Sequence, residues 1–202
     1  SNNLAQVGRG MQMYAASFGD SLPFVGWNPL KMSWQPTNEP NVDTVPNRRH
    51  VYALLRGGHV QTMWFVCPAG DAVPMPADQV RYRDDFIESR NLSYAYQNMA
   101  GVRPSLLDDP GLPILADDNP CFDDGHPLFD VLRRLGVSDP AESNSRAHRR
   151  AGQNVLTLDG RVIWTTTPNS GVRGDNIWTL NDVTKYAGHE GPKSTTDTHL
   201  LK

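Results

Sequence analysis

The first part of the chain carries a hydrophobic repeat that predicts an amphipathic helix over residues 1–18. Apolar side chains recur at spacings of 3 and 4, the period of one helix face, and they are Leu4, Val7, Met11, Tyr14 and Phe18. The other face is polar, and Gly19 follows where a left-handed C-terminal cap residue is common. We therefore expect a helix that buries one stripe. Either it starts abruptly, or it is the lower half of a longer helix.

The clearest strand signal is a pair of branched runs, 154–158 and 161–165, on either side of the Asp-Gly pair at 159–160. Asp-Gly between such runs favours a two-residue type I′ turn, because both turn residues then need positive φ. That turn places Leu156 opposite Ile163. Since both faces of the hairpin are then largely apolar, we expect it at the centre of the sheet, with the N-terminal helix against one face.

Five further segments have patterns of regular structure. They are a short helix at 48–56, an inner strand at 59–67, a half-buried strand at 91–98, a third strand at 112–116 and a brief helix at 126–135. Residues 20–47 are too rich in proline for a helix or most central strands, so we expect a long loop held by its aromatic rings. The tail over 168–202 is expected to cover the rest of the sheet.

Together these elements predict an α+β fold, with the N-terminal amphipathic helix packed on an antiparallel β-sheet and long Pro/Gly-rich loops. We expect a single domain over 1–202. It divides into the helix 1–18, the loop 20–47, and the sheet with its covering loops over 48–202.

Composition limits the classes of partner. The formal net charge of −3 is too small to indicate a nucleic-acid or membrane-surface partner, so no nucleic-acid partner is expected. No stretch approaches the roughly 20 apolar residues of a membrane span.

Two cysteines, Cys67 and Cys121, allow one disulfide or two buried thiols. Neither belongs to a CxxC pair, which gives zinc-ribbon and thioredoxin-like interpretations little support. Both alternatives stay open from the sequence.

Several segments resemble one known family. The opening SNNLAQVGRGMQMYAASFGDSLPF and the later SRAHRRAGQNVLTLDGRVIW carry most of the likeness, and the second has a His, about ten residues, and then Asp-Gly on a hairpin. The residues of that signature are His148, Asp159 and Gly160. FVCPAG at 65–70 and NLSYAYQN at 91–98 match the mid-region of the same group. The chain resembles type IV pilin-like and type II secretion pseudopilin-like proteins of the Planctomycetes type.

The resemblance implies a non-catalytic headgroup, a structural subunit of a pilin-like filament or secretion apparatus. Its implied partners are further copies or other pilin-like subunits, an inner-membrane assembly platform and a prepilin peptidase. It implies an extracytoplasmic place, in the periplasm or at the cell surface, with inner-membrane anchoring before assembly through a segment absent from this chain. The sequence departs from the family after Asp-Gly, where Arg161 and Ile163 replace the usual His and acidic residue. No metal or polar role is therefore expected of that pair.

Candidate ligand residues are scattered. The histidines and Cys67 fall on different predicted elements without a metal-ligand spacing, and acidic pairs such as Asp117-Asp118 are interpreted as turns. His148 lies between arginines; an anion contact is one interpretation, and a solvated loop or a histidine tied back to the hairpin is the one we favour. Some pseudopilins resembling this chain hold calcium in a C-terminal loop. A structural calcium would here use Asp175, Asp182 and Asp197, and no other cofactor and no catalytic residue is expected.

Two other function classes stay open. An extracytoplasmic glycan- or polymer-binding module would use exposed tryptophans among Trp27, Trp34, Trp64, Trp164 and Trp178. A metal-dependent hydrolase would need a cleft with convergent titratable side chains.

Overall fold

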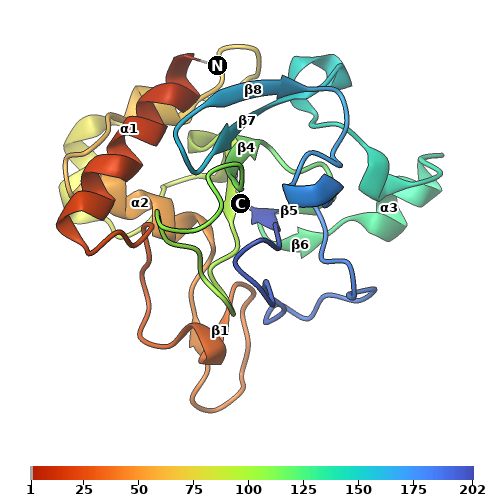
Figure 1. Ribbon diagram of the computed structural model, residues 1–202, viewed down its shortest axis with the longest axis horizontal. Coiled ribbons are helices and arrows are strands. Elements are labelled where there is room, and N and C mark those ends of the chain that lie inside the picture. The colour runs from red at the N-terminus through yellow and green to blue at the C-terminus, as the bar shows by residue number, and fades with distance from the viewer. Residues whose placement is uncertain (1) are drawn as a thin grey trace.

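The computed structural model describes residues 2–202, and position 1 of the predicted helix lies outside this range. The chain is a mixed α and β protein whose main sheet has five antiparallel strands in the order β8-β7-β4-β3-β9 (Figure 1). The strands of this sheet are β3 (Tyr94–Gln97), β4 (Pro113–Asp117), β7 (Gln153–Thr157), β8 (Val162–Thr165) and β9 (Leu200–Leu201). The predicted N-terminal helix on an antiparallel sheet is confirmed, and the mixture of helices and sheet is compatible with the predicted α+β class.

Besides short 3₁₀ helices, the described residues also form three α-helices and two minor strand pairs. The helices are α1 (Asn2–Ser17), α2 (Arg48–Arg56) and α3 (Phe129–Arg134); the pairs are β1 (Met32–Ser33) with β2 (Asp43–Thr44), which is parallel, and β5 (Phe122–Asp123) with β6 (His126–Pro127), which is antiparallel. In Figure 1, α1 and α2 lie on one side of the molecule, and α3 with the β5–β6 pair lies on the other.

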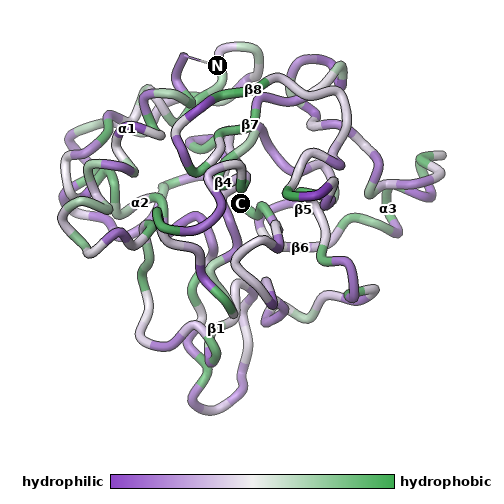
Figure 2. Tube along the Cα trace, viewed as in Figure 1, coloured by the Kyte–Doolittle hydropathy of each residue, from purple (hydrophilic) through white to green (hydrophobic). Residues whose placement is uncertain are grey.

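The first helix buries its stripe against the sheet. Leu4, Val7 and Met11 are buried, as predicted, while Tyr14 is half-buried and Phe18 is 54% exposed. Figure 2 shows hydrophobic and hydrophilic positions alternating along α1. Gly8 lets the helix approach the sheet closely, because a Cβ there would lie 2.8 Å from Leu156 Cδ1. The residue after the helix, Gly19, has φ +62°, as its predicted cap role requires.

The hairpin is at the edge of the sheet, so its predicted central place is wrong. Within residues 2–202, strand β8 has a neighbouring strand on one side only, and its Ile163 and Trp164 are 38% and 49% exposed. Its predicted register is also wrong by one residue, since Leu156 pairs with Val162 and Val155 with Ile163.

The turn type explains the shift. Thr157 N donates to Arg161 O at 2.9 Å, and Gly160 N donates to Thr157 O at 2.9 Å. The loop therefore has three residues, a type I turn closed by Gly160 at φ +86°, rather than the two-residue turn that Asp-Gly favours. One residue of slip reverses which side chains share a face, and it places Asn154 opposite Trp164.

The segment predicted as a strand at 59–67 contains instead a short 3₁₀ helix, Thr62–Phe65. It packs against α1, with Phe65 and Cys67 buried. The carbonyl oxygens of Met63 and Val66 accept hydrogen bonds from the side-chain amide of Asn3, at 3.2 and 2.8 Å. These bonds to a helix side chain use carbonyls that a strand would present to a sheet neighbour.

The other predicted elements agree more closely with the structure. The helix at 48–56 is confirmed with the same bounds, and the strands at 91–98 and 112–116 correspond to β3 and β4. Strand β3 is buried on both faces, so its predicted half-burial is wrong. The predicted helix at 126–135 starts later, because residues 126–127 form β6. Pro113 begins the central strand β4, where an irregular register between Pro113 and Leu115 accommodates a residue without an N–H donor.

The tail contributes to the core as expected and also adds a strand. Ile177, Trp178 and Leu180 are buried, and β9 pairs with β3. Within the described residues, no helix combines the length and apolar character needed to cross a membrane.

Candidate functional site

Three side chains from separate parts of the chain converge on the face of the sheet that α1 covers. Among the described residues, Cys67, Asp117 and His148 are the one group of three potential metal ligands, their donor atoms lying within 4.8 Å of one another. Their sequence pattern did not predict this meeting, because it places Cys67 and His148 on separate elements and Asp117 in a turn.

Strand geometry places Asp117 there. Residues two apart share a face of a strand, so Asp117 at the end of β4 points the same way as Leu115. Leu115 pairs with Leu156, whose side chain lies against Gly8 of α1. Asn154, two residues before Leu156, lies on the same face and hydrogen-bonds to Asp117.

Asp117 Oδ2 is the acceptor at the centre of this group. The backbone nitrogen of Asn154 donates to it at 2.7 Å, and the Nδ2 of the same residue donates at 3.0 Å. The Nε2 of His148 lies 3.2 Å from the same oxygen. The other carboxylate oxygen, Oδ1, is buried and has no hydrogen-bond partner among the described residues.

Cys67 approaches from the segment after the 3₁₀ helix. Its Sγ lies 3.5 Å from His148 Nε2. Its backbone nitrogen donates to Ser93 Oγ at 2.8 Å, which ties this segment to the chain just before β3. Burial raises the pKa of the Cys67 thiol, and the nearby Asp117 carboxylate raises it further, while a backbone hydrogen bond opposes the shift.

His148 sits in a strained loop. His148, Arg149 and Arg150 have φ values of 51°, 57° and 61°, three successive non-glycine residues in the left-handed region. The ring packs edge-on against Trp164, with centroids 5.2 Å apart. The favoured interpretation of a histidine tied back to the hairpin matches this geometry, because Asn154 and Trp164 both belong to the hairpin.

The two parts of the family-like signature do not form one site. His148 lies beside the start of β7, whereas Asp159 and Gly160 form the turn at its far end. Asp159 has a local task there: its Oδ1 accepts from Thr157 Oγ1 at 2.6 Å and its Oδ2 pairs with Arg161 Nε at 2.6 Å.

The arrangement differs from a nucleophile–histidine–carboxylate relay. Such a relay uses one ring nitrogen of the histidine for the nucleophile and the other for the carboxylate. Here the same atom, His148 Nε2, faces both Cys67 and Asp117. A raised thiol pKa also works against a thiolate nucleophile.

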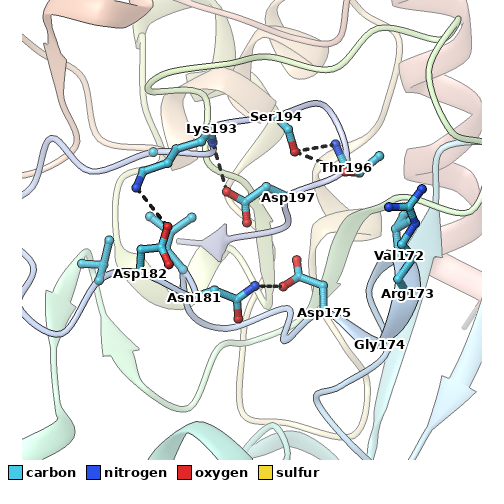
Figure 3. A pocket seen from close by; sticks show the side chains of 13 residues that line it. Val172, Arg173, Gly174, Asp175, Asn181, Asp182, Lys193, Ser194, Thr196 and Asp197 are labelled. Atoms are coloured by element: carbon cyan, nitrogen blue, oxygen red, sulfur yellow. Dashed lines mark hydrogen bonds and ion pairs between the residues drawn. The ribbon is translucent and has the colours of Figure 1, made fainter.

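The three calcium candidates do come together. Asp175, Asp182 and Asp197 line one pocket of about 390 Å³ (Figure 3). Lys193 lies among them, with Nζ 3.2 Å from Asp182 Oδ2 and its backbone N donating to Asp197 Oδ2 at 3.0 Å. Asp175 accepts from Asn181 Nδ2 and from Thr198 N, both at 2.8 Å. All three carboxylates thus have ion-pair or hydrogen-bond partners within the chain. Calcium binding here stays a prediction.

The two cysteines are free thiols in the structure, the second of the two predicted alternatives. The Sγ of Cys121 donates to Pro140 O at 3.0 Å, and burial raises the pKa of this thiol to about 12. Cys67 Sγ thus lies beside His148 Nε2, and Cys121 Sγ donates to Pro140 O; the two sulfurs are not bonded to each other.

The tryptophans do not gather on one surface. Trp34 and Trp178 are buried and Trp64 is half-buried. Trp27 and Trp164 are 63% and 49% exposed, but one lies in the long loop and the other on β8, where it packs on His148.

Comparisons of this chain with protein-family models, with curated proteins and with solved structures gave no match.

Proposed function

We propose that this chain is the globular headgroup of a pilin-like or pseudopilin-like subunit, with a structural and non-catalytic task in a filament or secretion apparatus. The observation that carries the proposal is the seating of α1, which buries Leu4, Val7 and Met11 on the face of an antiparallel sheet. A headgroup of this kind needs a helix that is fixed firmly to the sheet, so that force on the helix reaches the domain.

In this proposal α1 continues upstream as an apolar half-helix outside the present chain. The start of α1 lies at the edge of the molecule, where an extension can leave the domain (Figure 1). That half-helix would anchor the precursor in the inner membrane and then pack with other subunits in an extracytoplasmic filament. A prepilin peptidase and an assembly platform are the corresponding partners.

The test starts from the gene. We expect the codons before Ser1 to encode an apolar stretch of about 20 residues behind a prepilin cleavage site. When the full-length protein is produced with an active prepilin peptidase, immunogold electron microscopy should find it in filaments or short pseudopili. An inactive peptidase is the matched control, and it should leave the precursor uncut in the membrane fraction.

Two results would contradict the proposal. One is a gene without any apolar segment before Ser1. The other is a correctly processed protein that stays monomeric and never enters a filament or a complex with pilin-like subunits.

A further inference from the structure

We propose that Cys67, Asp117 and His148 bind a zinc ion that joins three distant chain segments beside the start of α1. The site is independent of the pilin-like function. Its dimensions, its donor set and a buried carboxylate oxygen without a hydrogen-bond partner among the described residues support it.

Potential ligand atoms surround one ring nitrogen. His148 Nε2 lies 3.2 Å from Asp117 Oδ2 and 3.5 Å from Cys67 Sγ. Asn154 Nδ2 also lies 3.1 Å from this nitrogen, but it donates to Asp117 Oδ2 at 3.0 Å. Asn154 therefore does not require the lone pair of His148 Nε2, which can be given to a cation.

A cation can use all three groups at once. The lone pair of His148 Nε2, a carboxylate oxygen of Asp117 and the Cys67 sulfur can all bind a positive ion, while Asn154 N and Nδ2 still donate to Asp117 Oδ2 at 2.7 and 3.0 Å. Binding releases the thiol proton of Cys67 to solvent, because the thiolate is the ligand. The buried Oδ1 of Asp117 has no hydrogen-bond partner within residues 2–202, which also indicates a missing ligand, since a buried unpaired carboxylate oxygen is costly.

The dimensions fit a tetrahedral ion. Zinc bonds of about 2.3 Å to sulfur and about 2.0–2.2 Å to nitrogen or oxygen place ligand atoms roughly 3.3–3.6 Å apart at tetrahedral angles. Two of the three separations are close to these values, 3.5 Å from Cys67 Sγ to His148 Nε2 and 3.2 Å from His148 Nε2 to Asp117 Oδ2, and all three donor atoms lie within 4.8 Å of one another. Three protein ligands leave the fourth position for a water molecule.

The donor set selects the metal. Thiolate, imidazole and carboxylate together suit zinc, whereas calcium and magnesium take oxygen ligands. The ligands are also held in place from outside: Trp164 packs on the ring of His148, and Asn154 binds the carboxylate of Asp117. Such supporting contacts are typical of metal sites. His148 is 25% exposed at its side chain, which gives an ion a route from solvent.

The test uses the tag-free, reduced chain and titrates it with Co²⁺ as a spectroscopic substitute for zinc. We expect one Co²⁺ per chain, a thiolate-to-cobalt charge-transfer band, the intense visible bands of a four-coordinate ion, and stoichiometric displacement by Zn²⁺. Cys67→Ser and His148→Ala should each weaken Zn²⁺ binding by more than about 100-fold, since even outer-shell changes cost 10–100-fold.

Cys121→Ser and His189→Ala are the matched controls. Cys121 is the other buried thiol and His189 is an exposed histidine, with a side chain 59% exposed, so both variants should bind Zn²⁺ like the parent chain. A parent spectrum without the thiolate band overturns the proposal by itself, even where a variant fails to fold. Equal Zn²⁺ affinity in the parent chain and in folded Cys67→Ser overturns it as well.

Discussion

Asn154 holds Asp117 with two hydrogen bonds, one from its backbone nitrogen at 2.7 Å and one from its side-chain Nδ2 at 3.0 Å. The pair joins the end of β4 to the start of β7 and fixes the carboxylate on the side of the sheet that faces α1. Both residues are buried. A charged acceptor in such a place depends strongly on each donor that remains.

Replacing Asn154 by Ala should therefore reduce the free energy of unfolding by about 1.5–3 kcal/mol, the usual cost of a lost hydrogen bond to a buried charge. Urea denaturation measures it. Asn169→Ala is the matched control, because Asn169 also donates to a carboxylate, that of Glu142 at 3.0 Å, but at an exposed position. Its cost should stay within about 0.5 kcal/mol. Equal costs for the two variants would contradict the interpretation.

The packing of α1 on the sheet can be tested with two methionines of the same helix. Met11 is 1% exposed and Met13 is 58% exposed. Met11→Ala should lower the free energy of unfolding by about 2–5 kcal/mol, because it removes a fully buried side chain. Met13→Ala makes the same chemical change on the outer face and should stay within about 0.5 kcal/mol. A large loss for Met13→Ala would mean that this face is covered in solution.

The three-residue hairpin loop depends on one glycine. Gly160 has φ +86°, so Gly160→Ala should cost about 1–2 kcal/mol, and Gly160→Asn should cost less because asparagine tolerates this region. Gly70→Ala is the control, since a Cβ there has its nearest neighbour at 3.8 Å and no positive φ is involved. Thermal unfolding ranks the three variants. An Ala that is tolerated at 160 would contradict this turn geometry.

The thiols should be unreactive in the folded protein. In the metal-free chain, burial raises the pKa of Cys67, and that of Cys121 to about 12, so at neutral pH little thiolate is present. A thiol-specific disulfide reagent should modify the native chain slowly and the urea-unfolded chain rapidly, with two equivalents consumed. If the unfolded chain, prepared without reductant, consumes none, the two cysteines form a disulfide.

Stability should fall in mild acid because of a buried histidine. Burial, assisted by Arg103 and Arg49, lowers the pKa of His50 to about 3, against 6.5 for an unperturbed histidine. Between these values the unfolded chain binds more protons than the folded one. The contribution is therefore complete above pH 6.5 and is lost as the pH falls, by about 1.4 kcal/mol per pH unit.

His50→Asn isolates this effect, because the Asn oxygen can replace the ring Nδ1 that accepts from Val25 N at 2.9 Å. Urea midpoints between about pH 4 and pH 6 should then depend less on pH than those of the parent chain. Asp118, whose pKa burial raises, opposes the trend in both proteins and cancels in the difference. An unchanged slope in His50→Asn would contradict this assignment.

The sequence predicted elements well where the governing contacts are local. The helix at 48–56 has its apolar side chains on one face and two glycines after it, and the structure has the same bounds. The segment 59–67 has the branched and aromatic composition of a strand. It is not one, because Asn3, far away in the chain, binds two of its carbonyl oxygens.

The hairpin register also depends on contacts with residues distant in the chain. Asp-Gly suits a two-residue turn and also a three-residue turn with glycine last. Hydrogen bonds to the segment before β4 decide between the two turns. Leu158 N donates to Leu112 O at 2.8 Å, and Asp159 N donates to Pro110 O at 3.1 Å. These bonds continue the pairing of β7 beyond Thr157 and hold Leu158 and Asp159 beside the neighbouring strand. No local pattern around Asp-Gly contains that information.

The sequence by itself determined the amphipathic first helix, the α+β class and the existence of the hairpin, since each follows from the spacing of apolar side chains along a few turns or residues. The tertiary structure alone decided the place of the hairpin at the sheet edge and the meeting of Cys67, Asp117 and His148. Those residues come from three distant segments, and their contact depends on strand register and on the seating of α1, which short-range spacing does not encode.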